Sequence, residues 1–111
     1  VQVGEEFVAP SPDAAAEIIN ASPRVEGREA NSMAVDIDRE TEEAGVYPVV
    51  LASYMIACET YEDSAEAELV KAYLSYVVSP EGQEAAAETA GSAPLSDDVS
   101  SEATEIVDKI S

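Results

Sequence analysis

The sequence predicts an α/β fold, on the basis of one uncharged apolar segment, one alternating segment and several helix patterns. The apolar segment, residues 47–58, carries no charge and lies between two acidic flanks. It is rich in valine, tyrosine and isoleucine, and Pro48 stands at its entry, where a missing N–H disturbs a strand least. The segment is shorter than the roughly 20 apolar residues that cross a bilayer. It therefore predicts a strand buried on both faces, as in the middle of an α/β sheet.

The first third of the chain predicts a short strand, a helix and a second strand. Residues 1–8 predict a strand-like or irregular entry. A helix follows, because Ser11 can cap it, Pro12 suits its first position, and Ser22 precedes a proline that ends it. After a polar loop, residues 33–38 alternate between apolar and polar side chains. This alternation predicts a strand with one face in solvent.

The second half of the chain predicts three helices. Asp63 and Glu66 form a pattern similar to a capping box, with Ser64 as a competing cap, and an apolar stripe follows as far as Val78. The remaining helix signals are Ser79 as a cap, Pro80 at a first helical position, Gly91 as a left-handed C-cap and Ser96 as the last cap.

The composition indicates a single acidic domain with a thin core. The 111 residues include 24 acidic and five basic side chains, for a net charge of −19. This charge repels phosphate backbones and anionic lipids, so we expect no nucleic-acid partner and no docking to a membrane surface. It fits either a solubilising surface or a surface that binds cations or a basic partner. Histidine is absent, which excludes Ser-His-Asp and Cys-His catalysis from this chain alone.

The single cysteine and the first residue each allow two interpretations. Cys58 is either a buried thiol that acts as a small hydrophobic residue, or half of a disulfide with a cysteine outside this sequence. The chain begins at Val1 without a secretory leader pattern. We therefore expect that a leader was removed or that these residues are the tail of a longer polypeptide.

Acidic clusters and one serine are the candidates for chemistry, and none completes a motif. Residues 36–43 are similar to the start of a calcium loop, but Thr41 occupies the sixth position, where an EF-hand needs glycine. Residues 5–6 and 59–63 could pair carboxylates for acid–base work, yet turns and helix starts explain their placement. Ser53 lacks the glycine-flanked elbow of a nucleophile. The residues therefore predict no enzyme, no cofactor and no metal site.

The order of the motifs in the second half resembles a known family. Tyr47 and Pro48 open the apolar segment, residues 69–83 end a helix pattern in Ser-Pro-Glu-Gly-Gln, and residues 90–95 read Ala-Gly-Ser-Ala-Pro-Leu. In this order they resemble the C-terminal part of the phosphate-binding proteins of phosphate ABC transporters, in their high-GC Gram-positive form. Residues 3–24 are similar to the stretch just before it in the same family.

This resemblance implies the C-terminal portion of a two-lobed α/β fold of the periplasmic-binding-protein type (type II). Residues 1–46 would belong to the second lobe, and residues 47–52 would cross the hinge, with Tyr47 and Pro48 as hinge residues. Residues 53–111 would return into the first lobe as a sheet strand and the C-terminal helices. The fold would be incomplete without upstream sequence, which would supply the neighbours of the predicted strand.

The resemblance also implies a function. The whole protein would be the solute-binding component of an ABC importer, capturing inorganic phosphate outside the cell as a surface or membrane-anchored lipoprotein. Phosphate ligands in this family lie in upstream loops, so no phosphate-binding residue is assigned here. Expected partners are inorganic phosphate, the rest of the same protein and the membrane subunits of the transporter. The alternatives are a stand-alone acidic interaction or cation-binding module, and a segment of an enzyme whose active residues lie upstream.

Overall fold

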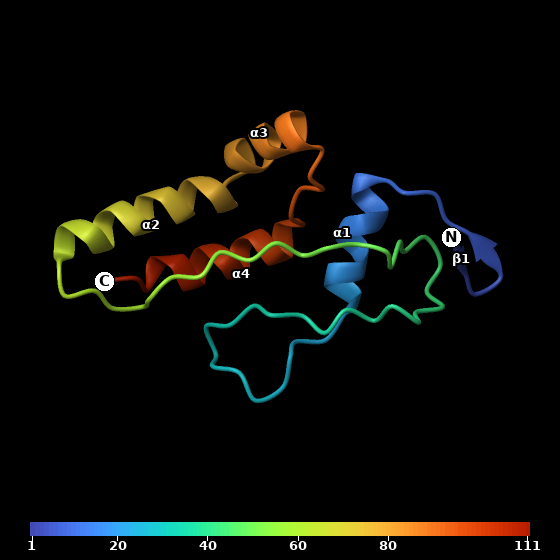
Figure 1. Ribbon diagram of the computed structural model, residues 1–111, viewed down its shortest axis with the longest axis horizontal. Helices are drawn as coiled ribbons and strands as arrows, with labels where there is room; N and C mark the ends of the chain where they lie inside the picture. The colour runs from blue at the N-terminus through green and yellow to red at the C-terminus, as the bar shows by residue number, and fades with distance from the viewer.

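The computed structural model describes all of residues 1–111 as a helix-rich domain with four helices and one two-stranded sheet (Figure 1). This architecture is compatible with part of an α/β fold, and its sheet is a small hairpin rather than a layer between helices. The elements in chain order are β1 (Gln2–Val3), β2 (Glu6–Phe7), α1 (Pro12–Ala21), α2 (Ser64–Val78), α3 (Pro80–Ala90) and α4 (Asp97–Asp108).

The N-terminal hairpin confirms the strand-like entry that the sequence predicts. Strands β1 and β2 pair antiparallel, with Gln2 opposite Phe7 and Val3 opposite Glu6. The turn between them passes through Gly4 at φ 57°, a left-handed conformation that glycine adopts without steric cost. Val3 is buried, while Phe7 on the other strand is exposed. The hairpin therefore contributes one side chain to the core.

All four helices begin at the caps that the sequence predicts. The Ser11 hydroxyl accepts a hydrogen bond from the N–H of the third helical residue of α1, and Ser79 and Ser96 do the same for α3 and α4. Asp63 caps α2, so the aspartate prevails over the competing Ser64. Gly91 ends α3 at φ 68°, the left-handed C-cap expected of glycine.

The main core lies between α2 and α4, which pack side by side (Figure 1). Leu74 of α2, Val107 of α4 and Ile110 just beyond α4 form one buried cluster, and Tyr61 packs against it. The backbone closes this unit, because the Tyr61 N–H donates to the carbonyl of Ser111 at 2.8 Å. The residues of this core therefore all come from the second half of the chain.

The N-terminal part of the chain has buried apolar residues of its own. Ile18 of α1 is completely buried, and Ala14 on the same helix, Val3 and Val46 are buried as well. In the whole chain only 12 of 111 residues are buried. The radius of gyration is 15.6 Å, against about 13 Å for a compact domain of this length. The chain therefore has a smaller core and a more open shape than a compact domain of the same length.

The apolar segment, residues 47–58, does not form the buried central strand that the sequence predicts. It runs as an irregular extended segment across the molecule between the N-terminal part and α2 (Figure 1). Leu51 is 94% exposed and Ile56 is 96% exposed. No backbone–backbone hydrogen bond involves residues 48–58. The prediction is wrong for this chain because a strand is buried by its neighbours, and no neighbouring strand is present here.

Two further predictions are corrected. Residues 33–38 do not form a strand; their pairing is one isolated bridge, in which Val35 lies antiparallel to Arg24. Cys58 is a free thiol but an exposed one, so its interpretation as a buried hydrophobic residue is wrong. Both corrections have one cause, which is that the predicted sheet does not form. Residues 33–38 would be a strand of that sheet, and the sheet would cover the apolar segment, which Cys58 ends.

Candidate functional site

The site predicted from the sequence is the hinge crossing at Tyr47 and Pro48, where the chain leaves its contact with α1. Val46 is buried, and the next N–H, that of Tyr47, donates to the carbonyl of Ala14 in α1 at 3.0 Å. Pro48 is also buried. The crossing therefore starts from a fixed point on α1, while residues 53–58 further along the segment are all exposed. The role of Tyr47 and Pro48 as a hinge stays a prediction.

Arg39 holds the start of the apolar segment, a role that the sequence analysis missed. Its Nη1 donates to the carbonyl of Pro48 at 3.0 Å and to that of Val50 at 3.2 Å. Its Nη2 also donates to Val50, at 3.2 Å. The planar guanidinium suits two carbonyls on one edge of an extended chain. The signal available in the sequence was the rarity of the residue, since Arg39 is one of five cations in a strongly acidic chain.

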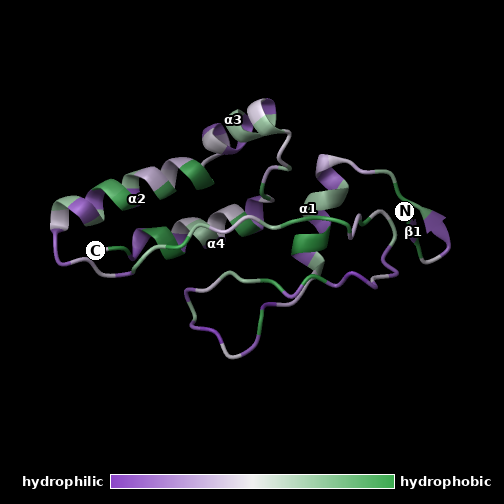
Figure 2. Ribbon diagram, in the orientation of Figure 1, coloured by the Kyte–Doolittle hydropathy of each residue, from purple (hydrophilic) through white to green (hydrophobic).

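The first half of the apolar segment alternates like a strand although it has no partner. Pro48, Val50 and Ala52 turn toward the protein and are buried or half-buried, whereas Val49 and Leu51 are exposed. An extended chain points successive side chains to opposite faces, so this alternation is the expected signature. Figure 2 shows the segment as largely hydrophobic, with no helix covering its whole length. The molecule thus presents an apolar strand-like surface in water.

Three contacts between two side chains join the part before the crossing to the part after it, beside the Val35 N–H that donates to the Tyr54 hydroxyl at 3.1 Å. Arg24 pairs with Glu102 of α4, and Asn20 accepts a hydrogen bond at 2.8 Å from the hydroxyl of Ser96. Asn31 donates at 2.8 Å to a carboxylate oxygen of Glu59. All three contacts are exposed, so each contributes modestly to stability. The two parts are therefore held together more loosely than α2 and α4 are.

An open cleft between α1 and α4 has the wrong charge for an anion. Its lining includes Glu17, Asp98 and Glu102, with Arg24 as the single cation. Arg24 is already paired with Glu102. Three carboxylates against one paired guanidinium give a negative local field, which repels phosphate. The cleft does not supply an anion site.

The helix N-termini, which are common anion sites in proteins, are also occupied in this chain. A side-chain oxygen caps each of them, as described above. Every helix also carries an acidic residue in its first turn: Asp13 in α1, Glu66 in α2, Glu81 in α3, and Asp97 with Asp98 in α4. These carboxylates use the positive end of the helix dipole for their own stabilisation. No N-terminus among them is arranged to receive a further anion.

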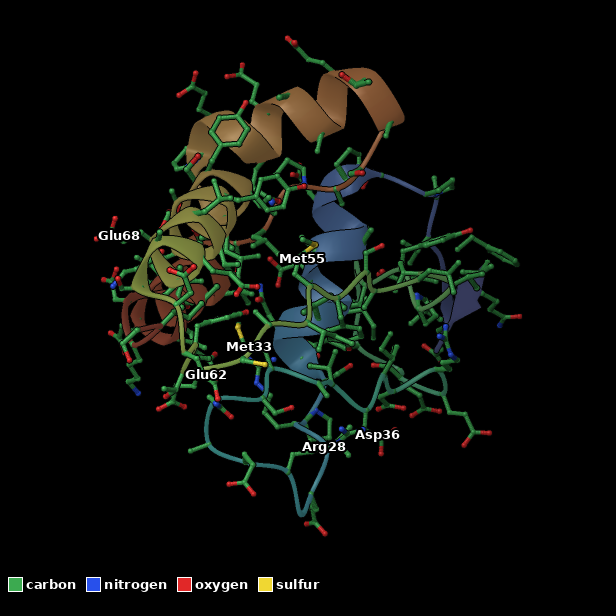
Figure 3. All side chains as sticks on the ribbon, turned by 60° about the vertical axis from the view of Figure 1, so that its left-hand side comes forward. Arg28, Met33, Asp36, Met55, Glu62 and Glu68 are labelled. Carbon is green, nitrogen blue, oxygen red and sulfur yellow. The ribbon has the colours of Figure 1, made fainter.

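The carboxylates considered for acid–base work are all exposed to solvent. Residues 5–6 sit in and beside the hairpin turn, and both are exposed. Asp63 is the cap of α2, and Glu59 accepts a hydrogen bond from Asn31. Figure 3 shows Glu62 and Glu68 on the outer side of the molecule. Water-exposed carboxylates in such places serve caps and solubility, which matches the structural explanation given from the sequence.

The calcium-loop-like stretch, residues 36–43, forms short polar turns. Asp38 accepts a hydrogen bond from the N–H of Glu40 at 3.1 Å, and the Thr41 hydroxyl accepts one from Glu43 at 3.1 Å. Such side-chain-to-backbone bonds are the usual way that aspartate and threonine form turns. No group of three or more acidic or cysteine side chains comes close enough to hold a metal ion.

Comparison with known proteins adds no relative to these observations. No family model, no curated protein and no solved structure matches the chain. None of the four helices is long and apolar enough to cross a membrane.

Proposed function

We propose that this chain is the C-terminal scaffold segment of a phosphate-capturing solute-binding protein of an ABC importer. The fold of the complete protein is a two-lobed α/β fold of the periplasmic-binding-protein type (type II). In this proposal residues 1–46 belong to the second lobe and residues 53–111 to the first. Residues 47–52 cross the hinge between them. The protein acts outside the cell, and its phosphate ligands lie upstream of this segment.

The observation that supports the proposal is the unpaired apolar segment. An extended stretch of valine, leucine, tyrosine and isoleucine that lies in water is costly, because its large apolar side chains stay in contact with the solvent. Upstream parts of the same protein would remove this cost by covering the segment. The order of the motifs from Tyr47 to Leu95 resembles that of the phosphate-binding proteins, and in that family the strands that cover the segment would lie upstream.

The charge of the chain restricts how phosphate can be held. A net charge of −19 repels the anion at long range. The cleft between α1 and α4 is acidic, and the helix N-termini carry their own carboxylates. The proposal therefore places every phosphate contact in upstream residues, where local backbone N–H groups can outweigh the distant negative charge.

The test begins with the mass of the native polypeptide, followed by calorimetric titration with phosphate and, separately, with sulfate and with calcium. The proposal expects a polypeptide longer than this 11.6 kDa chain that releases or absorbs heat with phosphate. A native chain of this mass that is monomeric and unfolds cooperatively would refute the scaffold assignment. Heat with calcium or sulfate but none with phosphate would refute the ligand, and calcium would favour the acidic cation-binding module instead.

A further inference from the structure

The odd-numbered residues of the apolar segment form a free strand edge. Val49, Leu51, Ser53, Met55 and Ala57 are all exposed. Their N–H and C=O groups make no hydrogen bond within the chain. In an extended chain the N–H and C=O of one residue point to the same edge, and those of its neighbour point to the other edge. The alternating exposure from Pro48 to Ala52 is that of an extended chain, so Val49 and Leu51 present their unpaired donors and acceptors on one edge, and Ser53, Met55 and Ala57 continue with backbone groups that are likewise free.

The opposite edge, formed by the even-numbered residues, is engaged near both of its ends, and at the far end the Cys58 N–H donates to the Tyr61 hydroxyl at 3.0 Å. Arg39 takes the carbonyls of Pro48 and Val50. The side chain of Tyr54 reaches the 33–38 segment, where its hydroxyl accepts a hydrogen bond from the N–H of Val35 at 3.1 Å. A strand that pairs with the first half of the segment on this side would have to displace the guanidinium of Arg39. The two edges are thus not equivalent.

We propose that residues 49–57 accept one β-strand along their odd-numbered edge, and that this strand is apolar with basic or neutral flanks. The inference rests on the proposed function in one respect, since it takes the strand from the upstream part of the same protein. Strand addition of this kind uses main-chain hydrogen bonds for affinity and alternate side chains for specificity. The free edge and the exposed apolar side chains of the segment offer both.

Charge decides against a second copy of this chain as the occupant. The segment itself is uncharged, but it lies between the acidic residues 40–43 and the acidic residues 59–63. Antiparallel pairing of two copies about Ser53 would place the flank 40–43 of one copy against the flank 59–63 of the other. Parallel pairing would place each flank against itself. Both arrangements bring like charges together, whereas a strand with basic flanks meets opposite charges.

The experiment titrates the 111-residue chain into two fluorescent synthetic peptides and follows anisotropy at low and at high salt. Both peptides alternate threonine and valine; one has lysine at each end and the other has aspartate. The inference expects saturable binding of the lysine-ended peptide, weakened by salt, and binding of the aspartate-ended peptide that is weaker by about tenfold or more. Equal binding of the two peptides, or no binding of the lysine-ended one, would overturn it.

Two proline variants test the edge itself. Ser53→Pro removes an N–H from the free edge and should weaken binding of the lysine-ended peptide about tenfold, the effect of one lost ladder hydrogen bond. Ala52→Pro removes an N–H from the other edge and is the matched control, with binding unchanged. Neither N–H is hydrogen-bonded in the chain, so both variants should keep their helical circular dichroism. Equal weakening by both prolines, or a dimer in sedimentation at low salt, would refute the edge assignment. Phosphate calorimetry on the native protein is independent of these results.

Discussion

A substitution at Gly82 tests the close backbone approach at the corner between α2 and α3. Ser79 ends α2 and begins α3: its hydroxyl donates to the carbonyl of Tyr76 at 2.7 Å and accepts from the N–H of Gly82 at 3.1 Å. This single-residue junction presses the backbone of the two helices together. A Cβ added at Gly82 would lie 2.0 Å from the carbonyl oxygen of Tyr76 and 3.2 Å from that of Val77.

The expected cost of Gly82→Ala follows from that geometry. Real Cβ atoms do not come closer than 3.0 Å to other atoms, so the backbone at the corner has to move by about 1 Å. Because the obstacle is backbone and cannot rotate away, the cost lies near the upper end of the range for overpacking, about 3 kcal/mol. Alanine returns up to about 1 kcal/mol through its better helix propensity. We expect a net loss of about 2 kcal/mol in the free energy of unfolding.

The assay is urea unfolding of the 111-residue chain, followed by circular dichroism at the helical band. Gly91→Ala is the matched control, because a Cβ there meets nothing within 4 Å. Only the left-handed φ of 68° disfavours alanine at this position. That control should lose about 1 kcal/mol. An unchanged or higher stability of Gly82→Ala would show that the corner accepts a Cβ without moving its backbone, which contradicts the close approach of Gly82 to Tyr76.

Four further substitutions probe the core, the ion pair, the apolar segment and the crossing. Leu74→Ala should lower the free energy of unfolding by about 2–4 kcal/mol in urea titration, since it empties the cluster between α2 and α4; a loss below that range would contradict the packing. Arg24→Gln should cost about 1–2 kcal/mol, and only the share of the ion pair should vanish at high salt, because Arg24 also donates to the Met33 carbonyl at 3.0 Å. Leu51→Ser should leave stability within about 0.5 kcal/mol and reduce binding of a hydrophobic dye. Pro48→Gly in the native protein should change domain closure, measured by small-angle scattering, and the apparent phosphate affinity without removing a ligand.

The helices could be predicted from the sequence because their signals are local. Ser11, Asp63, Ser79 and Ser96 each satisfy an N–H two or three residues away, so a short stretch of sequence contains both partners of the bond. Gly91 likewise ends its helix through its own backbone conformation. None of these features needs a distant segment, and all of them agree between sequence and structure.

The strands and the site could not be predicted in the same way because they depend on distant partners. The composition of residues 47–58 indicates burial, but composition does not state which strands would cover the segment. Residues 33–38 have the right alternation and find only a single bridge with Arg24. The clamp of Arg39 on two carbonyls joins residues nine and eleven positions apart, with no motif that marks the pairing. Local patterns therefore identify the apolar segment without giving its surroundings.

The size of the unburied apolar surface shows how much the apolar segment matters for stability. Val49, Leu51, Tyr54, Met55 and Ile56 are large apolar side chains that lie largely in water. Full burial of such side chains contributes about 1.5–3 kcal/mol each, and realistic unfolded states reduce that figure by roughly 10–40%. Covering the segment would then add on the order of 5–10 kcal/mol, which is comparable with the total stability of an ordinary domain. Cover over the faces of the segment would therefore change the stability of the chain more than any single cap or ion pair, which contributes about 0.5–2 kcal/mol.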